Sequence, residues 1–487
     1  MTTSDMPACH GEPPLTARTE PWMEELLANP AACQQLLQEH GSPVNVLDFS
    51  ALARNAGELT ESAAAHGLRL RVFVARKANK TLGLVDAAAQ GGLGLDVASL
   101  HELQQCLDRG VRANDLIVTA AVKSRELLEL AVRSGVIISL DNQDELLDLR
   151  QITTSLPEGS ARARVALRLA PSDPKIPASR FGLTDAAWLT ALTASAAERE
   201  ALSSTDVHVE GVHFHLNGYS ADERRRMLRH ACHFVDTLRG RGHPVEFIDM
   251  GGGVPMSYLE DGKNWRTFWS ALEQDTDGNS TWKGDRLGLT DPLSDRPSSA
   301  LYPFWQSPVR GPWLDSILGF AEPASAGDDA PSIAQMLNER HLELRCEPGR
   351  AVLDGCGMTL ASVAFVKQDR DGQGLVGLHM NRTQMRSTSV DVLVDPRWVR
   401  TEATVRGESI RGFLVGAYCV EDEAILRRRL TFPSGVKRSD IAAFVNTAGY
   451  LMHIVESPSH QLPLAHNVVR HESSWRRDPI DTQGSLP

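Results

Sequence analysis

The sequence predicts an α/β protein with a (β/α)8 barrel of the TIM type, followed by a mostly β C-terminal domain. Between residues 70 and 350, about eight short apolar runs alternate with amphipathic stretches, which is the order of strands and helices in such a barrel. After residue 351, short runs of strand-forming residues are separated by Asp, Gly and Pro, as in a sheet domain. The chain of 487 residues is long enough for both.

The apolar runs have the length and composition of buried parallel strands. They lie at 72–75, 95–98, 116–119, 136–140, 165–169, 207–214, 247–250 and 342–346. Helical patterns occur between them at 102–108, 124–133, 144–152 and 221–238. A doubly wound open sheet is the alternative, but no G-x-G-x-x-G follows the first run, and so many units are unusual for that fold.

The domain boundaries follow from these changes of pattern. Residues 1–42 are expected to form a polar N-terminal tail and a lead-in helix, 43–355 the barrel, and 356–487 the β domain with a polar tail. A strand pattern at 43–49 is a candidate member of the β domain. Further strands are expected at 352–366, 374–379, 389–394, 403–406, 411–415 and 444–446.

The connection between the last two barrel strands, 258–330, is too long for an ordinary βα unit. It holds five of the nine tryptophans, which are Trp265, Trp269, Trp282, Trp305 and Trp313. It is either a surface insertion that packs on itself, or a lid or dimer surface beside the active site, since it leaves from the end of a barrel strand.

Composition disfavours several classes of protein. The formal net charge of −12 and the lack of a long Lys/Arg run disfavour nucleic-acid binding. No apolar stretch approaches the roughly 20 residues that span a bilayer, so no membrane association is expected. The seven cysteines are odd in number, scattered and without a C-x-x-C pair. This pattern predicts reduced thiols in a cytoplasmic protein, with neither a disulfide framework nor a metal site.

Lys77 lies directly after the first predicted strand, at the end of the barrel where active sites are built. A lysine in that position can form a Schiff base with a carbonyl compound such as the aldehyde of pyridoxal phosphate. Taken alone, a solvated lysine at a strand end is the commoner case. Segments further along the chain favour the Schiff-base interpretation of Lys77, because each of them fits another part of a pyridoxal phosphate site.

The residues after the seventh and eighth strands fit a phosphate site and a partner for the ring nitrogen. Gly251, Gly252 and Gly253 would let backbone N–H groups approach a phosphate without interference from Cβ atoms, and a tight turn is the alternative. Glu347 would hold its carboxylate against the pyridine nitrogen, and Arg350 would add positive charge near the phosphate. For this pair the alternative is a salt bridge at the barrel end.

Four further residues are candidates for the chemistry. His215, at the end of the sixth strand, would stack on the cofactor ring, or else it is a core histidine. Cys419, in a Gly-x-x-Cys segment, would exchange a proton with the substrate α-carbon, or else it is an inert thiol. Asp96, in the second predicted strand, and Glu102, in the helix after it, would orient Lys77 or His215.

Together these motifs resemble the ornithine/diaminopimelate/arginine decarboxylase family, the fold type III pyridoxal phosphate enzymes with the alanine-racemase-like fold. The resemblance covers most of the chain, from residue 43 to 450. The matching segments, in the family's order, are V-A-R-K-A-N at 74–79, G-L-D-V-A-S at 94–99 with E-L at 102–103, L-R-L at 167–169, S-R-F-G at 179–182, H-F-H at 213–215, G-G-G at 251–253 and E-P-G-R at 347–350.

The resemblance implies a role for each matched residue. Lys77 would carry the cofactor as a Schiff base, His215 would stack on its ring, and Glu347 would pair with its nitrogen. The phosphate would be held by Gly251, Gly252, Gly253, Arg350 and Tyr450, and the cofactor set would be completed by Asp96, Arg168 and Gly349. Cys419 and nearby acidic residues would reach into the partner's site across a head-to-tail homodimer with two shared active sites.

The departures from the family pattern lie mostly on the substrate side. Gly218 replaces a serine whose hydroxyl usually touches the phosphate. Val420 replaces the acidic residue that binds the distal amine of basic substrates, and the tyrosine expected after Arg386 is absent. Arg386, Glu421 and Asp422 are the remaining candidates for substrate binding.

The sequence therefore predicts a pyridoxal phosphate-dependent decarboxylase of a non-standard amino acid, with Lys77 as the Schiff-base lysine and Cys419 as the acid or base from the partner subunit. One alternative is a racemase or epimerase on the same fold, with Lys77 and Cys419 on opposite faces of the α-carbon. The other is a non-catalytic pyridoxal phosphate carrier, which the presence of the β domain disfavours.

Overall fold

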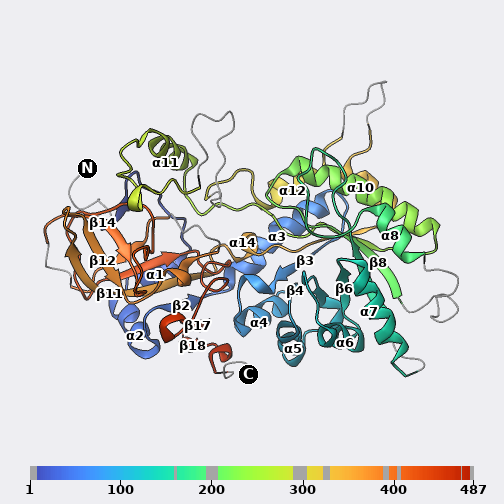
Figure 1. Cartoon of the computed structure of the whole chain (residues 1–487), viewed down its shortest axis with the longest axis horizontal. Helices are drawn as coiled ribbons and strands as arrows, with labels where there is room; N and C mark the ends of the chain where they lie inside the picture. The colour runs from blue at the N-terminus through green and yellow to red at the C-terminus, as the bar shows by residue number, and fades with distance from the viewer. Residues whose placement is uncertain are drawn as a thin grey trace.

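A closed barrel of parallel strands lies beside a domain built on a large sheet (Figure 1). The computed structural model of the chain describes residues 8–157, 162–193, 207–288, 304–321, 330–387, 394–402, 407–472 and 474–482. The barrel strands, in order around the barrel, are β3 (Leu70–Ala75), β4 (Gly94–Val97), β5 (Leu116–Val118), β6 (Ile137–Leu140), β7 (Ala163–Arg168), β8 (Val207–His213), β9 (Phe247–Asp249) and β10 (Glu343–Cys346).

The barrel closes where the last strand pairs with the first. Leu344 of β10 lies opposite Leu70 of β3 in parallel register. A buried cluster on the barrel strands fills the interior, and it consists of Phe73, Ile117, Ile137, Ala166 and Phe247. Every predicted strand is present, which confirms the barrel. The open-sheet alternative is wrong, because such a sheet leaves its first and last strands unpaired.

Helices cover the outside of the barrel (Figure 1). They are α3 (Ser50–Ala65), α4 (Leu82–Gln90), α5 (Leu100–Asp108), α6 (Arg125–Ser134), α7 (Gln143–Thr154), α8 (Asp185–Leu192), α10 (Ala221–Gly240), α12 (Arg310–Leu318) and α13 (Ile333–Glu339). Side-chain oxygens of Ser99, Ser124, Asn142, Thr184 and Ser220 accept backbone N–H groups at the starts of α5, α6, α7, α8 and α10. No helix in the described ranges is long and apolar enough to cross a lipid bilayer.

The second domain is a ten-stranded sheet. Its main path runs β1-β15-β14-β12-β11-β2-β17-β18, and β16 pairs with both β11 and β13. The strands are β1 (His10–Gly11), β2 (Val44–Leu47), β11 (Gly357–Gln368), β12 (Gly374–Leu378), β13 (Arg397–Val399), β14 (Ile410–Val415), β15 (Leu430–Phe432), β16 (Ile441–Val445), β17 (His466–His471) and β18 (Ser474–Arg477). The early strand β2 thus lies in this sheet, antiparallel to β11 and parallel to β17.

The described N-terminal residues differ from the predicted tail and single lead-in helix. Residues 10–11 form β1, which pairs with β15, and Leu15 is fully buried. Two helices follow, α1 (Pro21–Leu27) and α2 (Pro30–His40). The break is local, because Pro30 disfavours helical backbone at the residue before it, and Asn29 caps α2 by accepting the Ala32 N–H at 3.1 Å.

Two further segments differ from the sequence prediction. The strand pattern expected at 352–366 begins with a short helix, α14 (Arg350–Leu353), before β11. This helix turns the chain from the barrel end toward the sheet. The strand expected at 403–406 and most of the one expected at 389–394 lie outside the described residues.

The tryptophan-rich insertion contacts both domains. It contains α11 (Gly262–Gln274), beside the sheet in Figure 1, a short 3-10 turn at Trp282–Gly284, and α12 on the barrel. The Trp282 ring packs edge-on against Phe413 of β14, with ring centroids 5.3 Å apart. The Trp313 ring N–H donates to Tyr219 O at 2.9 Å, on the loop after β8. The insertion also packs on itself, because the Trp265 ring contacts the rings of Phe268, Trp269 and Phe304. Its role as a lid or dimer surface stays a prediction.

The polar C-terminal tail is also ordered over residues 474–482, because Asp478 ties it to the barrel. The Asp478 carboxylate is buried and accepts the backbone N–H groups of Leu82 and Gly83 at 3.0 and 2.8 Å, at the start of α4. It also accepts the Ile480 N–H at 2.9 Å. A residue near the end of the chain thus caps a barrel helix.

We expect Asp478→Ala to lower the free energy of unfolding by about 2–4 kcal/mol, because three backbone N–H groups lose their acceptor. Urea denaturation measures this change. Arg476→Ala, at an exposed position of β18, is the matched control and should change the stability by less than about 0.5 kcal/mol. An Asp478→Ala variant as stable as the wild type would contradict the capping role.

Candidate functional site

A cavity lies at the carboxyl ends of the barrel strands, between the loops that follow β3, β8, β9 and β10. It is lined by Lys77, His215, Leu216, Asn217, Gly218, Tyr219, Gly252, Gly253, Val254, Glu347, Gly349, Arg350 and Tyr450. Most of the predicted cofactor residues are in this set. The exceptions are Asp96, Arg168 and Gly251, which lie behind the cavity wall.

Lys77 projects from a 3-10 turn, η1 (Arg76–Ala78), that follows β3. Its Nζ donates to Oδ2 of Asp96 at 2.7 Å, and Asp96 is fully buried on β4. Burial alone would lower the pKa of Lys77, but the attraction of the Asp96 carboxylate, aided by Tyr450 and Glu347, outweighs burial, and the pKa is raised. In the ligand-free protein Lys77 is therefore a charged amine held at the cavity wall.

The three glycines after β9 are required by backbone conformation and by close packing. Gly251 and Gly253 have φ of +66° and +75°, which side chains with a Cβ rarely adopt. A Cβ on Gly252 would lie 2.9 Å from the Glu347 carbonyl oxygen. The loops after β9 and β10 therefore approach each other through backbone atoms.

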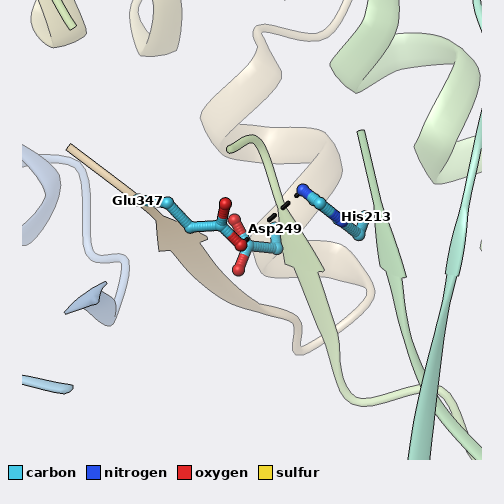
Figure 2. Close-up of side chains that lie close together, drawn as sticks. All are labelled: His213, Asp249 and Glu347. Carbon is cyan, nitrogen blue, oxygen red and sulfur yellow. Dashed lines mark ion pairs between the residues drawn. The ribbon is translucent and has the colours of Figure 1, made fainter. Parts of the chain in front are cut away.

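Glu347 belongs to a buried cluster with Asp249 and His213, from three neighbouring strand ends (Figure 2). Glu347 Oε1 lies 3.6 Å from His213 Nε2. Within the described residues, Glu347 Oε1, Asp249 Oδ2 and His213 Nε2 have no hydrogen-bond partner. Burial, with the nearby carboxylates of Asp96 and Asp249, raises the pKa of Glu347, and burial also raises the pKa of Asp249. The two carboxyl groups therefore retain a proton more readily than usual.

His213 holds its ring proton on the side of Glu347. Its Nδ1 accepts the Arg168 Nε–H at 3.2 Å and lies 2.5 Å from Ser139 Oγ. Burial, followed by the charge of Arg168, lowers the pKa of His213 well below its usual range, so the ring is neutral. Because Nδ1 accepts, the proton is on Nε2. Arg168 itself pairs with Asp141 at 2.8 Å and supports the cluster from behind.

The three donor types of this cluster also suit a divalent cation, since their ligand atoms all lie within 4.8 Å of one another. From the scattered cysteines in the sequence, no metal site is expected. Glu347 is the member of the cluster that lines the cavity, so a ligand in the cavity and a cation in the cluster would compete for one carboxylate.

His215 separates the cavity from a second one, since it lines both. Its ring meets the Phe181 ring edge-on, at a centroid distance of 5.8 Å. Burial, with the positive charges of Lys77 and Arg168, lowers the pKa of His215 to about 4. The imidazole is therefore neutral at physiological pH, as a ring that stacks on a ligand should be.

Arg350, Gly349 and Tyr450 close the remaining side. Arg350 Nη1 donates to Tyr258 Oη at 3.2 Å, and its guanidinium lies 5.0 Å from the Tyr450 ring centroid. The Tyr450 backbone, with φ of +73°, donates its N–H to Ala78 O at 2.7 Å. A Cβ on Gly349 would lie 2.7 Å from Tyr450 Oη. The sheet domain thus supplies one wall of a cavity that is otherwise built by the barrel.

The predicted substrate residues are not brought to this cavity by their own chain. Cys419 is exposed, and Glu421 points into solvent with Lys283 at 3.8 Å. Asp422 accepts from Arg382 Nη1 at 3.1 Å, and Arg386 is buried. Neither Cys419, the predicted acid or base, nor any of the three predicted substrate residues lines the cavity.

Several residues of the site carried no assignment from the sequence. His213 belongs to the H-F-H segment but was given no role, and Asp249 lies just before the G-G-G segment, so the position of both residues was a usable signal. Asn217 and Tyr219 line the cavity from the loop after β8, and only their closeness to His215 in the sequence pointed to them. Arg224, on α10, had no signal at all, because it lies outside every motif.

The chain is similar to several known proteins. A family model described as "Pyridoxal-dependent decarboxylase, pyridoxal binding domain" matches residues 54–276. An uncharacterized protein, y4yA, of Sinorhizobium fredii is 29% identical over 428 residues, which cover 87% of each chain. A diaminopimelate decarboxylase of Zymomonas mobilis is 22% identical over 424 residues, 85% of each chain.

Solved structures share the fold. The diaminopimelate decarboxylase of Helicobacter pylori, solved in complex with L-lysine, superposes with a TM-score of 0.66 at 17% identity. The superposition covers 92% of this chain and 97% of that chain. Both the barrel and the sheet domain are therefore common to the two proteins.

We expect Asp96→Asn to lower the pKa of Lys77 by about 1–3 units, because the largest interaction that raises it is lost while burial remains. More of the amine is then unprotonated at pH 8 to 9, and Lys77 should be labelled faster there. The pH dependence of reductive methylation in the ligand-free protein, followed by peptide mass spectrometry, measures this. Asp86→Asn, whose carboxylate pairs with Arg109 away from the cavity, is the control. An unchanged labelling profile in Asp96→Asn would contradict the assignment.

Proposed function

The chain belongs to the fold type III pyridoxal phosphate-dependent decarboxylases, the family of the ornithine, diaminopimelate and arginine decarboxylases, and we propose that it decarboxylates a non-standard amino acid. The observation that carries the proposal is that Lys77 and Glu347, from the first and last strands, line one cavity. Gly252, Gly253 and Arg350 line it with them.

The cavity residues fit the cofactor at both of its ends. Glu347 Oε1 is buried and has no hydrogen-bond partner among the described residues, so it is available to the N–H of a pyridine ring. At the other end, Gly252 and Gly253 line the cavity without side chains, and Arg350 provides positive charge for a phosphate. We propose Lys77 as the covalent attachment point between these ends.

Bound pyridoxal phosphate supplies an aldehyde that forms a Schiff base with amines and a ring that withdraws electrons from the substrate α-carbon. The residues of the chain set the conditions for that chemistry. Asp96 orients the Lys77 amine, and Glu347, backed by Asp249 and His213, would hold a proton for the ring nitrogen. The neutral ring of His215 would cover one face of the cofactor ring and exclude water from that face.

We assign the proton that replaces the carboxylate to Cys419 of a partner subunit. Cys419 is the one exposed cysteine of seven free thiols, and it lies outside the cavity of its own chain. Exposed apolar side chains nearby in the sequence or in the same domain, Val420, Ile454 and Val455, are suited to a protein contact. A head-to-tail homodimer would bring each Cys419 against the other subunit's cavity. The free thiols also support a cytoplasmic location.

The substrate is proposed to lack the distal amine of ornithine. Val420 is 46% exposed at the position where the resemblance expects an acidic residue, so no carboxylate is offered there. Asp422 pairs with Arg382 at 3.1 Å, whereas Glu421 lies on the surface, 3.8 Å from Lys283 Nζ. Arg386, Glu421 and Asp422 remain the candidates for contact with the substrate in the dimer.

The first test combines a spectrum with turnover. We expect the protein with pyridoxal phosphate to absorb visible light, and borohydride to remove this absorbance and fix the cofactor on the peptide that contains Lys77. Lys77→Ala should lose the absorbance and release CO2 about 1000-fold or more slowly. Lys80→Ala is the matched control, because Lys80 Nζ pairs with Glu456 at 2.6 Å outside the cavity.

The reaction type is decided by screening amino acids in heavy water. Release of CO2 with one deuterium at the α-carbon supports decarboxylation. Exchange of the α-hydrogen with retention of the carboxylate for every substrate that reacts would identify a racemase or epimerase instead.

Mixing two inactive variants tests the shared site. Lys77→Ala and Cys419→Ala homodimers, each assayed alone, should have little activity. After exchange of subunits, half of the dimers carry one intact site, so about a quarter of the wild-type activity should return. No recovery, with subunit exchange verified by mass spectrometry, would contradict a Cys419 that acts across the dimer.

A further inference from the structure

Arg224 is a buried cation beside the cavity that the proposed mechanism does not use. It lies in the first turn of α10 and is fully buried. No carboxylate in the described part of the chain forms an ion pair with it, and its Nε has no hydrogen-bond partner there. Burial lowers the pKa of Arg224 to about 10, with Glu223 and Tyr219 opposing the shift, so the side chain stays charged at neutral pH. A buried charge without a counter-charge requires an explanation.

The hydrogen bonds of Arg224 join the two loops that form the cavity wall opposite Lys77. Its Nη2 donates to Gly218 O at 2.8 Å, on the loop after β8, and to Gly252 O at 3.1 Å, on the loop after β9. Its Nη1 donates to Ser220 O at 3.2 Å. All three acceptors are backbone carbonyls. These hydrogen bonds fix the orientation of the Arg224 guanidinium, but they do not neutralise its charge.

These bonds also set the direction of two peptide groups. In a planar trans peptide, the C=O and the following N–H point in opposite directions. Since the carbonyls of Gly218 and Gly252 point at Arg224, the N–H groups of Tyr219 and Gly253 point away from it. Both residues line the cavity. Within the described residues, no acceptor takes the Gly253 N–H, so it is a free donor at the cavity wall.

Space around the guanidinium is tightly restricted. A Cβ on Gly253 would clash with Arg224 Nη2, and the Trp313 ring lies 5.3 Å from the Arg224 guanidinium carbon. The charge is therefore held directly behind the glycine loop. A dianion in the cavity would lie next to the oriented N–H donors, and the positive charge of Arg224 would lie behind these donors.

We propose that Arg224 is a positioning residue for the phosphate group of the cofactor. It orients the N–H donors of the two loops toward the cavity, and its unpaired charge is balanced when the phosphate is bound. This inference rests on the proposed function. Its consequence is specific, because Arg224 contributes to binding only through the phosphate and leaves binding of the aldehyde and ring unchanged.

The test compares two aldehydes that differ only in the phosphate. The affinities of the cofactor-depleted protein for pyridoxal phosphate and for pyridoxal are measured by absorbance titration. We expect Arg224→Gln to weaken pyridoxal phosphate binding about 10- to 100-fold, and to change pyridoxal binding by less than about 3-fold. Arg226→Gln, on the same helix but paired with Asp222 at the surface, is the matched control and should leave both affinities unchanged.

Two results for Arg224→Gln would overturn the inference. Equal weakening of both aldehydes would show a merely structural role, and unchanged affinity for both would show no role. If Arg224→Gln does not fold, Arg224→Lys decides the question, because lysine keeps the charge but cannot hold the guanidinium geometry. We then expect about 3- to 10-fold weaker pyridoxal phosphate binding with pyridoxal unchanged, and any other pattern overturns the inference.

The same titration separates this inference from the proposed function. A wild-type chain that binds no pyridoxal phosphate overturns both. A wild-type chain that binds it, with the ratio of the two affinities unchanged in Arg224→Gln, overturns the role of Arg224 alone.

Discussion

Closure of the barrel is the constraint on which the whole site depends. Because β10 pairs with β3 in parallel, the loop after the last strand lies beside the loop after the first. The Ala75 N–H donates to Pro348 O at 3.1 Å across this junction. Lys77 and Glu347, which are distant in the sequence, therefore face one cavity. An open sheet would place its first and last units apart, where no single small ligand contacts both.

The second constraint is the balance of charge in a buried space. Asp96 balances Lys77, and Asp141 balances Arg168. In the described part of the chain, the carboxyl groups of Glu347 and Asp249 form no ion pair with a lysine or arginine, so their pKa values rise and they retain a proton. At the glycine loop the imbalance has the opposite sign, because no carboxylate of the described residues forms an ion pair with Arg224. The cavity thus matches a ligand with a protonated nitrogen at one end and an anion at the other.

The parts of the site that the sequence predicts are those determined by local order along the chain. Lys77 and Glu347 follow apolar runs directly, so the barrel rule alone assigns them to one face. The contact between Asp249, Glu347 and His213 depends on strand register, and the bonds of Arg224 depend on two loops that meet in space. Leu15 at the N-terminus is buried through the packing of distant segments, which no local pattern reveals.

The division of the site between barrel and sheet domain explains where the sequence keeps the family pattern and where it departs from it. Gly251 and Gly252 are each confined by backbone atoms of a neighbouring loop, so a change at either requires the strand ends themselves to move. Val420 and Glu421 lie on an exposed turn where a new side chain meets mostly solvent. If the turn meets the partner's cavity as proposed, its residues can change the chemistry offered to a substrate with little cost to the stability of their own chain. The proposed substrate contacts are then free to vary, whereas the glycine loop is fixed by packing.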